Sequence, residues 1–184
     1  SKSQIDFLIN HNFPKDKISL ISKGSIKGVD LNEFKLKKIK KKIKNSKFNL
    51  SENTLIILFL GRISPEKGIH TYLSTIIEIV NQGYDIKGFI VGRDEKNILK
   101  NYRKKNLDFD KYFKYFGYTN KPEFFLKLSD LVLIPSSREG FCQVAIEASS
   151  CEVPVIGFDV IGLKDSIKHN VSGYLVPYKD EKGF

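Results

Sequence analysis

Long apolar runs are missing from this sequence of 184 residues. No segment approaches the roughly 20 apolar residues that cross a bilayer, and the first residues lack the charged-then-apolar pattern of a secretory signal. Methionine is absent, and the chain begins in polar, helix-like sequence. These absences favour a soluble, cytoplasmic protein and a chain excised from a longer one. With 41% hydrophobic residues, the composition still supports one compact domain.

Residues that bind metals are also scarce. The two cysteines, Cys142 and Cys151, form no C-x-x-C pair with a histidine, and the three histidines lie far apart in the sequence. Asp108 and Asp110 resemble the acidic pair of metal-dependent transferases, but they follow polar residues rather than an apolar strand, which predicts a polar loop. Cys142 lies near Glu139 without a histidine partner, so core packing is favoured over a nucleophilic thiol. We expect no metal and no cofactor.

Positive charge, by contrast, is abundant, with a formal net charge of +10. Much of it lies between Lys35 and Lys47, where apolar residues recur at helical spacing and predict a basic amphipathic helix. Two interpretations stay open, a helix that faces solvent and a contact with an anionic membrane surface at the inner face of the cytoplasmic membrane. Nucleic-acid binding rests on the charge alone, because the chain lacks the aromatic-and-basic pattern of single-strand binders. We therefore expect no nucleic-acid partner.

Short apolar segments alternate with helical patterns along the chain. The predicted strands are 55–60, 86–91, 112–116, 131–134, 153–158 and 174–176, and the predicted helices are 69–80, 94–107, 122–128, 141–150 and 163–169. Because parallel strands need crossover connections, this alternation predicts an α/β fold with a doubly wound parallel sheet. Residues 51–184 are expected to form this Rossmann-like domain. Residues 1–50, with a short strand at 18–21, are expected to form an interdomain or edge segment.

A loop rich in glycine and cations follows the first predicted strand. In residues 61–68, Arg62 and Lys67 lie between Gly61 and Gly68. The amides at a helix N-terminus, together with flanking cations, suit a phosphate or diphosphate. The loop is not a Walker A motif, because no Ser or Thr follows as a magnesium ligand. Taken alone, it is equally compatible with an ordinary turn whose cations face solvent.

A second loop, at residues 136–141, precedes a predicted helix that carries one carboxylate among small and apolar residues. Glu139 lies in the loop and Glu147 about two turns into the helix, while Gly140 allows a ligand close to the backbone. Carboxylates accept hydrogen bonds well from neighbouring hydroxyls. The alternative is that Glu139 complements the helix dipole and Glu147 pairs with a lysine. Ligands of doubly wound sheets bind outside the carboxyl ends of the strands, which draws attention to both loops.

Taken together, the motifs resemble a known family. The segments LGRISPEKGI, SSREGFCQVAIEA, PVIGF and VSGYLVP occur in the order found in the C-terminal domain of family-four retaining glycosyltransferases of the GT-B architecture. GSIKGVDLNEF is similar to the segment that joins the two domains in members that build bacterial surface polysaccharides, including capsule and lipopolysaccharide. Gly162 to Ile167 resembles their Gly-x-x-Asp-x-Ile loop. The resemblance covers nearly the whole chain.

The resemblance implies roles for particular residues. Arg62 and Lys67, after Gly61, would hold the diphosphate of a nucleotide sugar and act on the leaving group. Glu147 would bind the ribose hydroxyls and Glu139 the donor sugar. Backbone amides around residues 140–142, which are Gly140, Phe141 and Cys142, would help to hold the distal phosphate. Cys142 stands where glycine is common, and Ile161 replaces one glycine of the more usual sugar-side loop.

The resemblance also implies a reaction and its partners. A sugar would pass from a nucleotide sugar, UDP first and GDP second, to a glycan or lipid-linked acceptor held by a separate N-terminal domain. Retention in the family is described as front-face displacement without a protein nucleophile or a metal. A non-hydrolysing sugar-nucleotide epimerase would need a similar diphosphate site, but the spacing of the two glutamates favours the transferase. The isolated domain is expected to bind the donor without transferring its sugar.

Overall fold

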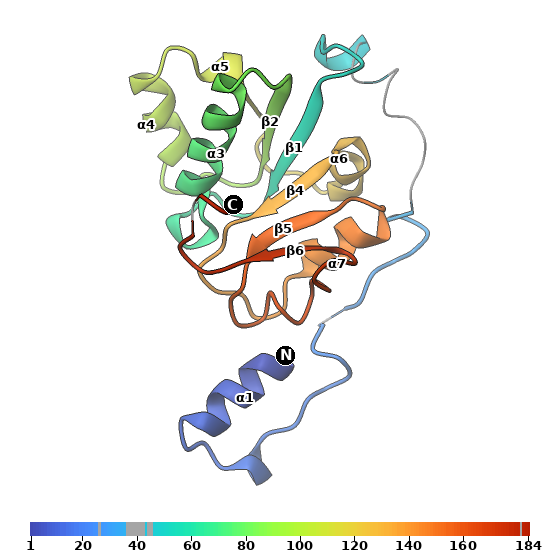
Figure 1. Ribbon diagram of the computed structural model, residues 1–184. Coiled ribbons are helices and arrows are strands. Elements are labelled where there is room, and N and C mark those ends of the chain that lie inside the picture. Colours follow the sequence, from blue (N-terminus) through green and yellow to red (C-terminus); the bar gives the residue numbers. More distant parts are fainter. Residues whose placement is uncertain (26, 36–42, 44–45, 181) are drawn as a thin grey trace.

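A six-stranded parallel sheet forms the centre of the computed structural model, which describes residues 1–25, 27–35, 43, 46–180 and 182–184 (Figure 1). The strands are β1 (Leu55–Leu60), β2 (Ile86–Val91), β3 (Phe113–Tyr115), β4 (Leu131–Ile134), β5 (Val155–Phe158) and β6 (Gly173–Val176). They lie in the order β3-β2-β1-β4-β5-β6, and every neighbouring pair is parallel. The doubly wound parallel sheet predicted from the sequence is therefore confirmed.

Helices cover both faces of this sheet, because each strand buries alternate residues on opposite sides. On one face, Ile57 and Phe59 pack in a cluster with residues of α3 (Ile69–Asn81), α4 (Ile98–Lys105) and α5 (Phe109–Tyr112). On the other face, Ile56 and Leu58 pack with residues of α6 (Pro122–Leu128) and α7 (Gln143–Ser150). Phe34 and Phe48 join this second cluster. The sheet is thus enclosed by two apolar cores, which leaves its strand ends for binding.

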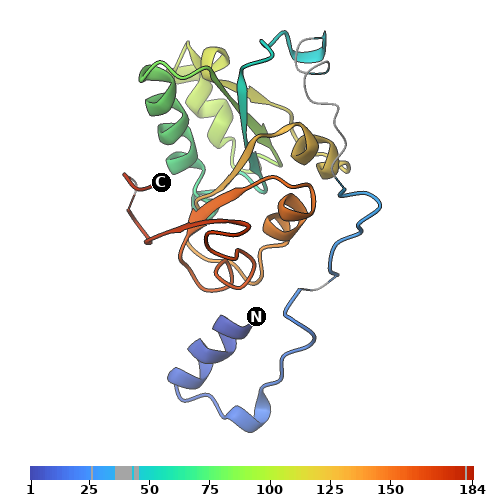
Figure 2. The same cartoon turned by 45° about the vertical axis from the view of Figure 1, so that its right-hand side comes forward.

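The segment before the sheet contains α1 (Lys2–Asn10) and a short 3-10 helix (Lys15–Lys17). Both lie outside the sheet, beyond the carboxyl ends of its strands (Figure 2). The predicted strand at 18–21 is wrong. These residues have no regular secondary structure and lie in no sheet, and Ile21 is 85% exposed. Most of the predicted basic helix between Lys35 and Lys47 lies outside the described residues. Among the residues that are described, no helix combines the length and apolar character needed to cross a bilayer.

Four other predicted elements differ from the structure. Residues 163–169 form no helix: residues 163–166 are in turns and His169 is in an isolated bridge with Gly173. Leu163 and Ile167 are nevertheless buried, so their apolar spacing reflects packing. The predicted helix 94–107 is shorter and begins at Ile98, after Asp94 has accepted hydrogen bonds from three amides of its first turn. The polar loop predicted around Asp108 and Asp110 runs into the short helix α5, because Phe109 is buried in the core. The strand predicted at 112–116 is confined to 113–115.

Candidate functional site

The two glycine-rich loops lie against each other at the carboxyl ends of β1 and β4. Pro65–Lys67 forms a 3-10 turn, and Gly68 adopts a left-handed conformation with φ of 74°. The backbone amide of Ser137 donates to the carbonyl oxygen of Glu66 at 2.9 Å. Because β1 and β4 are neighbours whose crossovers run in opposite directions, these loops flank the switch point at which such sheets bind ligands.

Gly68 sets how closely the loops approach, which leads to a stability prediction. A Cβ atom at Gly68 would lie 2.0 Å from the carbonyl oxygen of Pro135. We expect Gly68→Ala to lower the free energy of unfolding by more than the roughly 1–3 kcal/mol of left-handed strain alone. Gly83→Ala is the matched control, since Gly83 also has a positive φ, of 95°, but no atom within 4 Å of the added methyl group. Equal losses in the two variants, measured by urea denaturation, would contradict the close approach.

Lys67 and Glu139, one from each loop, form an ion pair. The Lys67 Nζ atom donates to Glu139 Oε1 at 2.7 Å and to Oε2 at 2.8 Å. The side chains are 26% and 9% exposed, so the pair is partly shielded from water. A cation held at the end of β1 is thus matched by a carboxylate at the end of β4. A phosphate that enters this place competes with Glu139 for the same ammonium group.

Three adjoining cavities follow the edge of the sheet along these loops. The first, of about 460 Å³, contains Arg62, Arg93, Tyr118 and Glu147. The second, of about 230 Å³, shares Gly61 with the first and contains Lys67, Phe141 and Cys142. The third, of about 320 Å³, shares Lys67 and Glu139 with the second and contains Arg62, Arg138 and Gly140. All eight site residues predicted from the sequence therefore line these three cavities, which we together call the trough, with Glu147 in the first cavity and Glu139 in the second and third.

Glu147 lies at the inner wall of the first cavity, on α7. The residue is only 5% exposed, and this burial raises the pKa of its carboxyl group, although a hydrogen bond from Gln143 and the charge of Lys27 oppose the rise. A buried carboxylate with spare acceptor positions suits a ligand that brings hydroxyl groups. Glu147 lines a different cavity from Glu139, so the structure separates the two glutamates that the sequence placed eight residues apart.

Cys142 lies at the start of α7, in the wall of the second cavity. The side chain is buried, and this burial, reinforced by the nearby charge of Glu139, raises the pKa of its thiol to about 12. A thiolate nucleophile is therefore disfavoured at neutral pH. The prediction that Cys142 serves packing rather than nucleophilic chemistry agrees with this environment. Cys151 is also buried, and its Sγ atom donates to the carbonyl oxygen of Phe34 at 3.1 Å.

Sequence reasoning missed the residues at the far end of the first cavity. The guanidinium group of Arg93 lies over the ring of Tyr118, 4.5 Å from its centroid, although Tyr118 itself is 65% exposed. Lys27, Glu95 and Thr119 line the same cavity. Arg93 and Tyr118 follow β2 and β3, respectively. Their positions directly after two predicted strands were the available signal.

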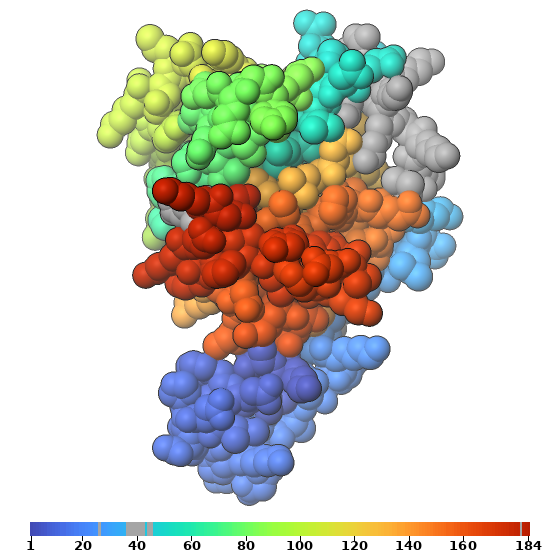
Figure 3. All heavy atoms as spheres, in the orientation of Figure 1, coloured from blue at the N-terminus to red at the C-terminus, as the bar shows by residue number. Residues whose placement is uncertain are grey.

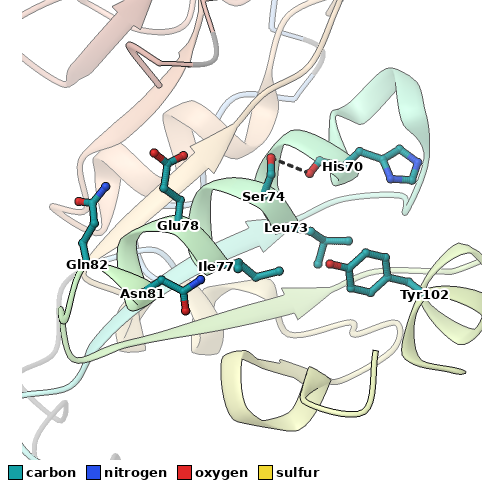
Figure 4. Close-up of a pocket in the computed structure, with 8 residues that line it drawn as sticks. All are labelled: His70, Leu73, Ser74, Ile77, Glu78, Asn81, Gln82 and Tyr102. Carbon is teal, nitrogen blue, oxygen red and sulfur yellow. Dashed lines mark hydrogen bonds between the residues drawn. The ribbon is translucent and has the colours of Figure 1, made fainter. Parts of the chain in front are cut away.

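Another cavity, of about 560 Å³, lies on the outer surface of α3 and contains none of the predicted residues (Figure 4). The hydroxyl group of Ser74 donates back to the carbonyl oxygen of His70 within the helix. The acidic pair is also remote from the trough, since Asp110 forms its ion pair with Arg103 of α4. Neither Asp108 nor Asp110 lines the three adjoining cavities.

The comparisons with known proteins decide the family. The model of the family described as "Glycosyl transferases group 1" matches residues 40–184, which is most of the chain. The chain belongs to this glycosyltransferase family. The matched residues include both cation-bearing loops and both glutamates. It also favours a transferase over the epimerase and the nucleic-acid-binding module considered from the sequence.

Similar proteins include one named for capsular polysaccharide biosynthesis and one named for galactosyl transfer to a sugar on diphosphoundecaprenol. The chain is 31% identical over 183 residues to the capsular polysaccharide biosynthesis glycosyltransferase CapM of Staphylococcus aureus, covering 95% of this chain and 46% of CapM. It is 28% identical over 171 residues to the UDP-Gal:alpha-D-GlcNAc-diphosphoundecaprenol alpha-1,3-galactosyltransferase of Escherichia coli, covering 91% of this chain and 43% of that enzyme. The chain thus spans about half the length of these curated relatives.

Solved structures share the fold. The Anabaena protein Alr3699/HepE, crystallised in complex with UDP and glucose, superposes with a TM-score of 0.82 at 21% identity, over 100% of this chain and 49% of that one. A Rickettsia africae glycosyltransferase superposes with a TM-score of 0.83, also at 21% identity, over 100% and 49% of the two chains. The likeness supports the predicted Rossmann-like half of a GT-B glycosyltransferase.

Proposed function

We propose that this chain is the donor-binding half of a retaining hexosyltransferase that moves a sugar from a UDP-sugar to a glycan or lipid-linked acceptor in surface polysaccharide biosynthesis. The observation that carries the proposal is the trough, whose lining residues suit the three parts of a nucleotide sugar. Glu147 and the Arg93–Tyr118 stack suit a ribose and its base, Lys67 and Arg62 suit a diphosphate, and Glu139 suits a sugar.

In this proposal the chain's cations act on the leaving group. The bond between the anomeric carbon and the diphosphate breaks, and the acceptor oxygen bonds to the same face of the sugar. The acceptor proton passes to the departing phosphate oxygen, so no protein nucleophile is needed. Arg62 and Lys67 neutralise the charge that grows on the diphosphate, a type of stabilisation that is commonly worth several kcal/mol. The acceptor is held by a separate domain, corresponding to the half of the relatives that this chain does not match.

We propose that donor binding needs no divalent metal, because Arg62 and Lys67 supply the positive charge themselves. The test is calorimetry of UDP with this chain, in the presence and absence of EDTA. The dissociation constant is expected to change by less than about twofold on chelation. In a control titration, added magnesium should likewise leave the dissociation constant of UDP nearly unchanged. Binding that vanishes with EDTA and returns with magnesium would overturn the metal-free site, whereas no UDP binding in any buffer would overturn the proposed function.

We also propose that the enzyme works in the cytoplasm at the inner face of the membrane, held by the lysines between Lys35 and Lys47. The stretch contains eight lysines. Vesicles rich in anionic lipid are expected to sediment the chain at low salt and to release it above roughly 0.5 M salt, where charges are screened beyond a few ångströms. Neutral vesicles are the control, and a chain with four of these lysines changed to glutamine should bind less. If the chain does not sediment at low salt, the membrane contact is contradicted and the interpretation of these lysines as facing solvent is favoured.

A further inference from the structure

The first turn of helix α1 is hydrogen-bonded to the turns at residues 161–166, which follow β5. The Ser3 amide donates to Asp165 Oδ2 at 2.9 Å, and the Ser3 hydroxyl donates to the same oxygen at 2.7 Å. The Ser3 hydroxyl in turn accepts a hydrogen bond from the amide of Gly162 at 2.8 Å. Ser3 is 9% exposed, although most of α1 stands clear of the sheet. Figure 3 shows this N-terminal segment against one side of the main body.

The turns at residues 161–166, to which Ser3 is hydrogen-bonded, also contact the loop that contains Glu139. The amide of Glu139 donates to the carbonyl oxygen of Ile161 at 3.3 Å. Gly162 approaches the same loop so closely that an added Cβ would lie 2.2 Å from the carbonyl oxygen of Glu139. Gly162 has φ of 83°, a conformation that glycine adopts without strain. Asp165 is therefore linked to Glu139 and Gly140 through one tightly packed turn.

The link places Gln4 at the outer end of the trough. Gln4 lines the third cavity together with Arg62, Lys67 and Glu139. Its Oε1 atom accepts from the nitrogen of Ser1 at 3.0 Å, which fixes the direction of the amide. Nε2 lies 3.8 Å from the position of a Cβ on Gly140. Among the described residues, the Gln4 side chain has a hydrogen bond at Oε1 and none at Nε2, so Nε2 is available as a donor to a ligand in the cavity.

From this geometry we propose that Gln4 is a specificity residue for the sugar of the donor, and that Asp165 is a positioning residue that holds α1 over the third cavity. The inference rests on the proposed function and names a contact within its sugar end. The hydroxyl or carbonyl oxygens of a hexosyl group accept from Nε2, while Glu139 accepts from hydroxyl groups in the same cavity. The pair of an amide donor and a carboxylate acceptor distinguishes sugars by the direction of their hydroxyls.

Calorimetry on the whole chain tests this pair of roles, with UDP, UDP-glucose, UDP-galactose and UDP-N-acetylglucosamine as probes. The quantity of interest is the ratio of the dissociation constants of UDP and the best UDP-sugar. Gln4→Ala is expected to shift that ratio against the UDP-sugar by about 3- to 10-fold, the effect of one lost hydrogen bond, with UDP itself changed less than twofold. Asp6→Asn is the matched control, because Asp6 is exposed on the same helix and lines none of the three cavities.

Asp165→Ala is expected to shift the ratio in the same direction, and the double variant with Gln4→Ala should lose no more than the single variants. This non-additivity distinguishes a positioning residue from one that only stabilises the fold. An unchanged ratio in Gln4→Ala would overturn the inference while UDP binding upholds the proposed function. Additive losses would overturn the role of Asp165 alone. Failure of the unaltered chain to bind UDP would overturn the proposed function itself, and the inference with it.

Discussion

Glu147→Gln is expected to weaken UDP binding by about 10- to 100-fold, whereas Glu139→Gln is expected to leave UDP affinity unchanged or to raise it. Glu147 is a buried acceptor in the first cavity, and an amide there replaces a charged contact to the ribose hydroxyls with a weaker one. Glu139 holds Lys67 through two hydrogen bonds, so its neutralisation releases the ammonium group for the diphosphate. Calorimetry with UDP on the two variants measures both effects.

Stability provides the control for this comparison. Because burial raises the pKa of Glu147 in the folded chain, its ionised form costs folding free energy at neutral pH, and that cost disappears as the pH falls through this pKa. Glu147→Gln should therefore fold at least as stably as the unaltered chain. UDP affinity of the unaltered chain should fall as the same carboxyl group becomes protonated, above the pH at which an ordinary glutamate does so. Equal loss of UDP affinity in both variants would refute the division of roles.

Lys67→Met is expected to lower UDP affinity by about 10- to 100-fold and also to lower the free energy of unfolding by about 1–3 kcal/mol. The loss of affinity follows from the missing contact to the diphosphate. The loss of stability follows from Glu139, whose side chain is 9% exposed and would lack its partner. Methionine keeps most of the side-chain volume, so the change concerns charge rather than packing.

The double variant Lys67→Met with Glu139→Gln separates the two consequences. Its stability should return towards that of the unaltered chain, since no unpaired charge is left in the site. Its UDP affinity should stay low, because the cation is still missing. Urea denaturation and calorimetry on the same samples give both quantities. A double variant that binds UDP as the unaltered chain does would show that Lys67 serves only to neutralise Glu139.

Three of the strands, β1, β2 and β4, could be predicted from the sequence because most of their residues are buried. Residues 55–60 and 131–134 are continuous apolar runs, residues 86–91 are mostly apolar, and all three strands have the predicted bounds. Residues 18–21 are also rich in apolar side chains, but no strand lies beside them in the described part of the chain. Residues 163–169 show helical spacing, yet Gly162 and the loop of Glu139 hold this segment in turns. Apolar spacing alone thus decides neither burial nor the element that forms, because both depend on neighbours far away in the sequence.

The candidate site was predictable where one loop carries its own chemistry. Arg62, Lys67 and Glu139 stand in motifs whose residue types already suit a diphosphate and a sugar. The contribution of Gln4 could not be predicted, because it depends on a contact between Ser3 and Asp165, 162 residues apart. The Arg93–Tyr118 stack likewise joins the ends of two strands. Contacts of this kind follow from topology rather than from local sequence.

The position of β1 in the sheet has a consequence for synthesis on the ribosome. β1 pairs on one side with β2, but its other neighbour is β4, whose register pairs Ile57 with Leu131. Asp130, which accepts from the Ile56 amide, follows Ile56 by 74 residues. At about 5–20 residues per second, the ribosome needs several seconds to supply that partner. During this interval an apolar strand edge stays open on the nascent chain, so chaperone binding is expected to be greatest before residues 131–134 emerge.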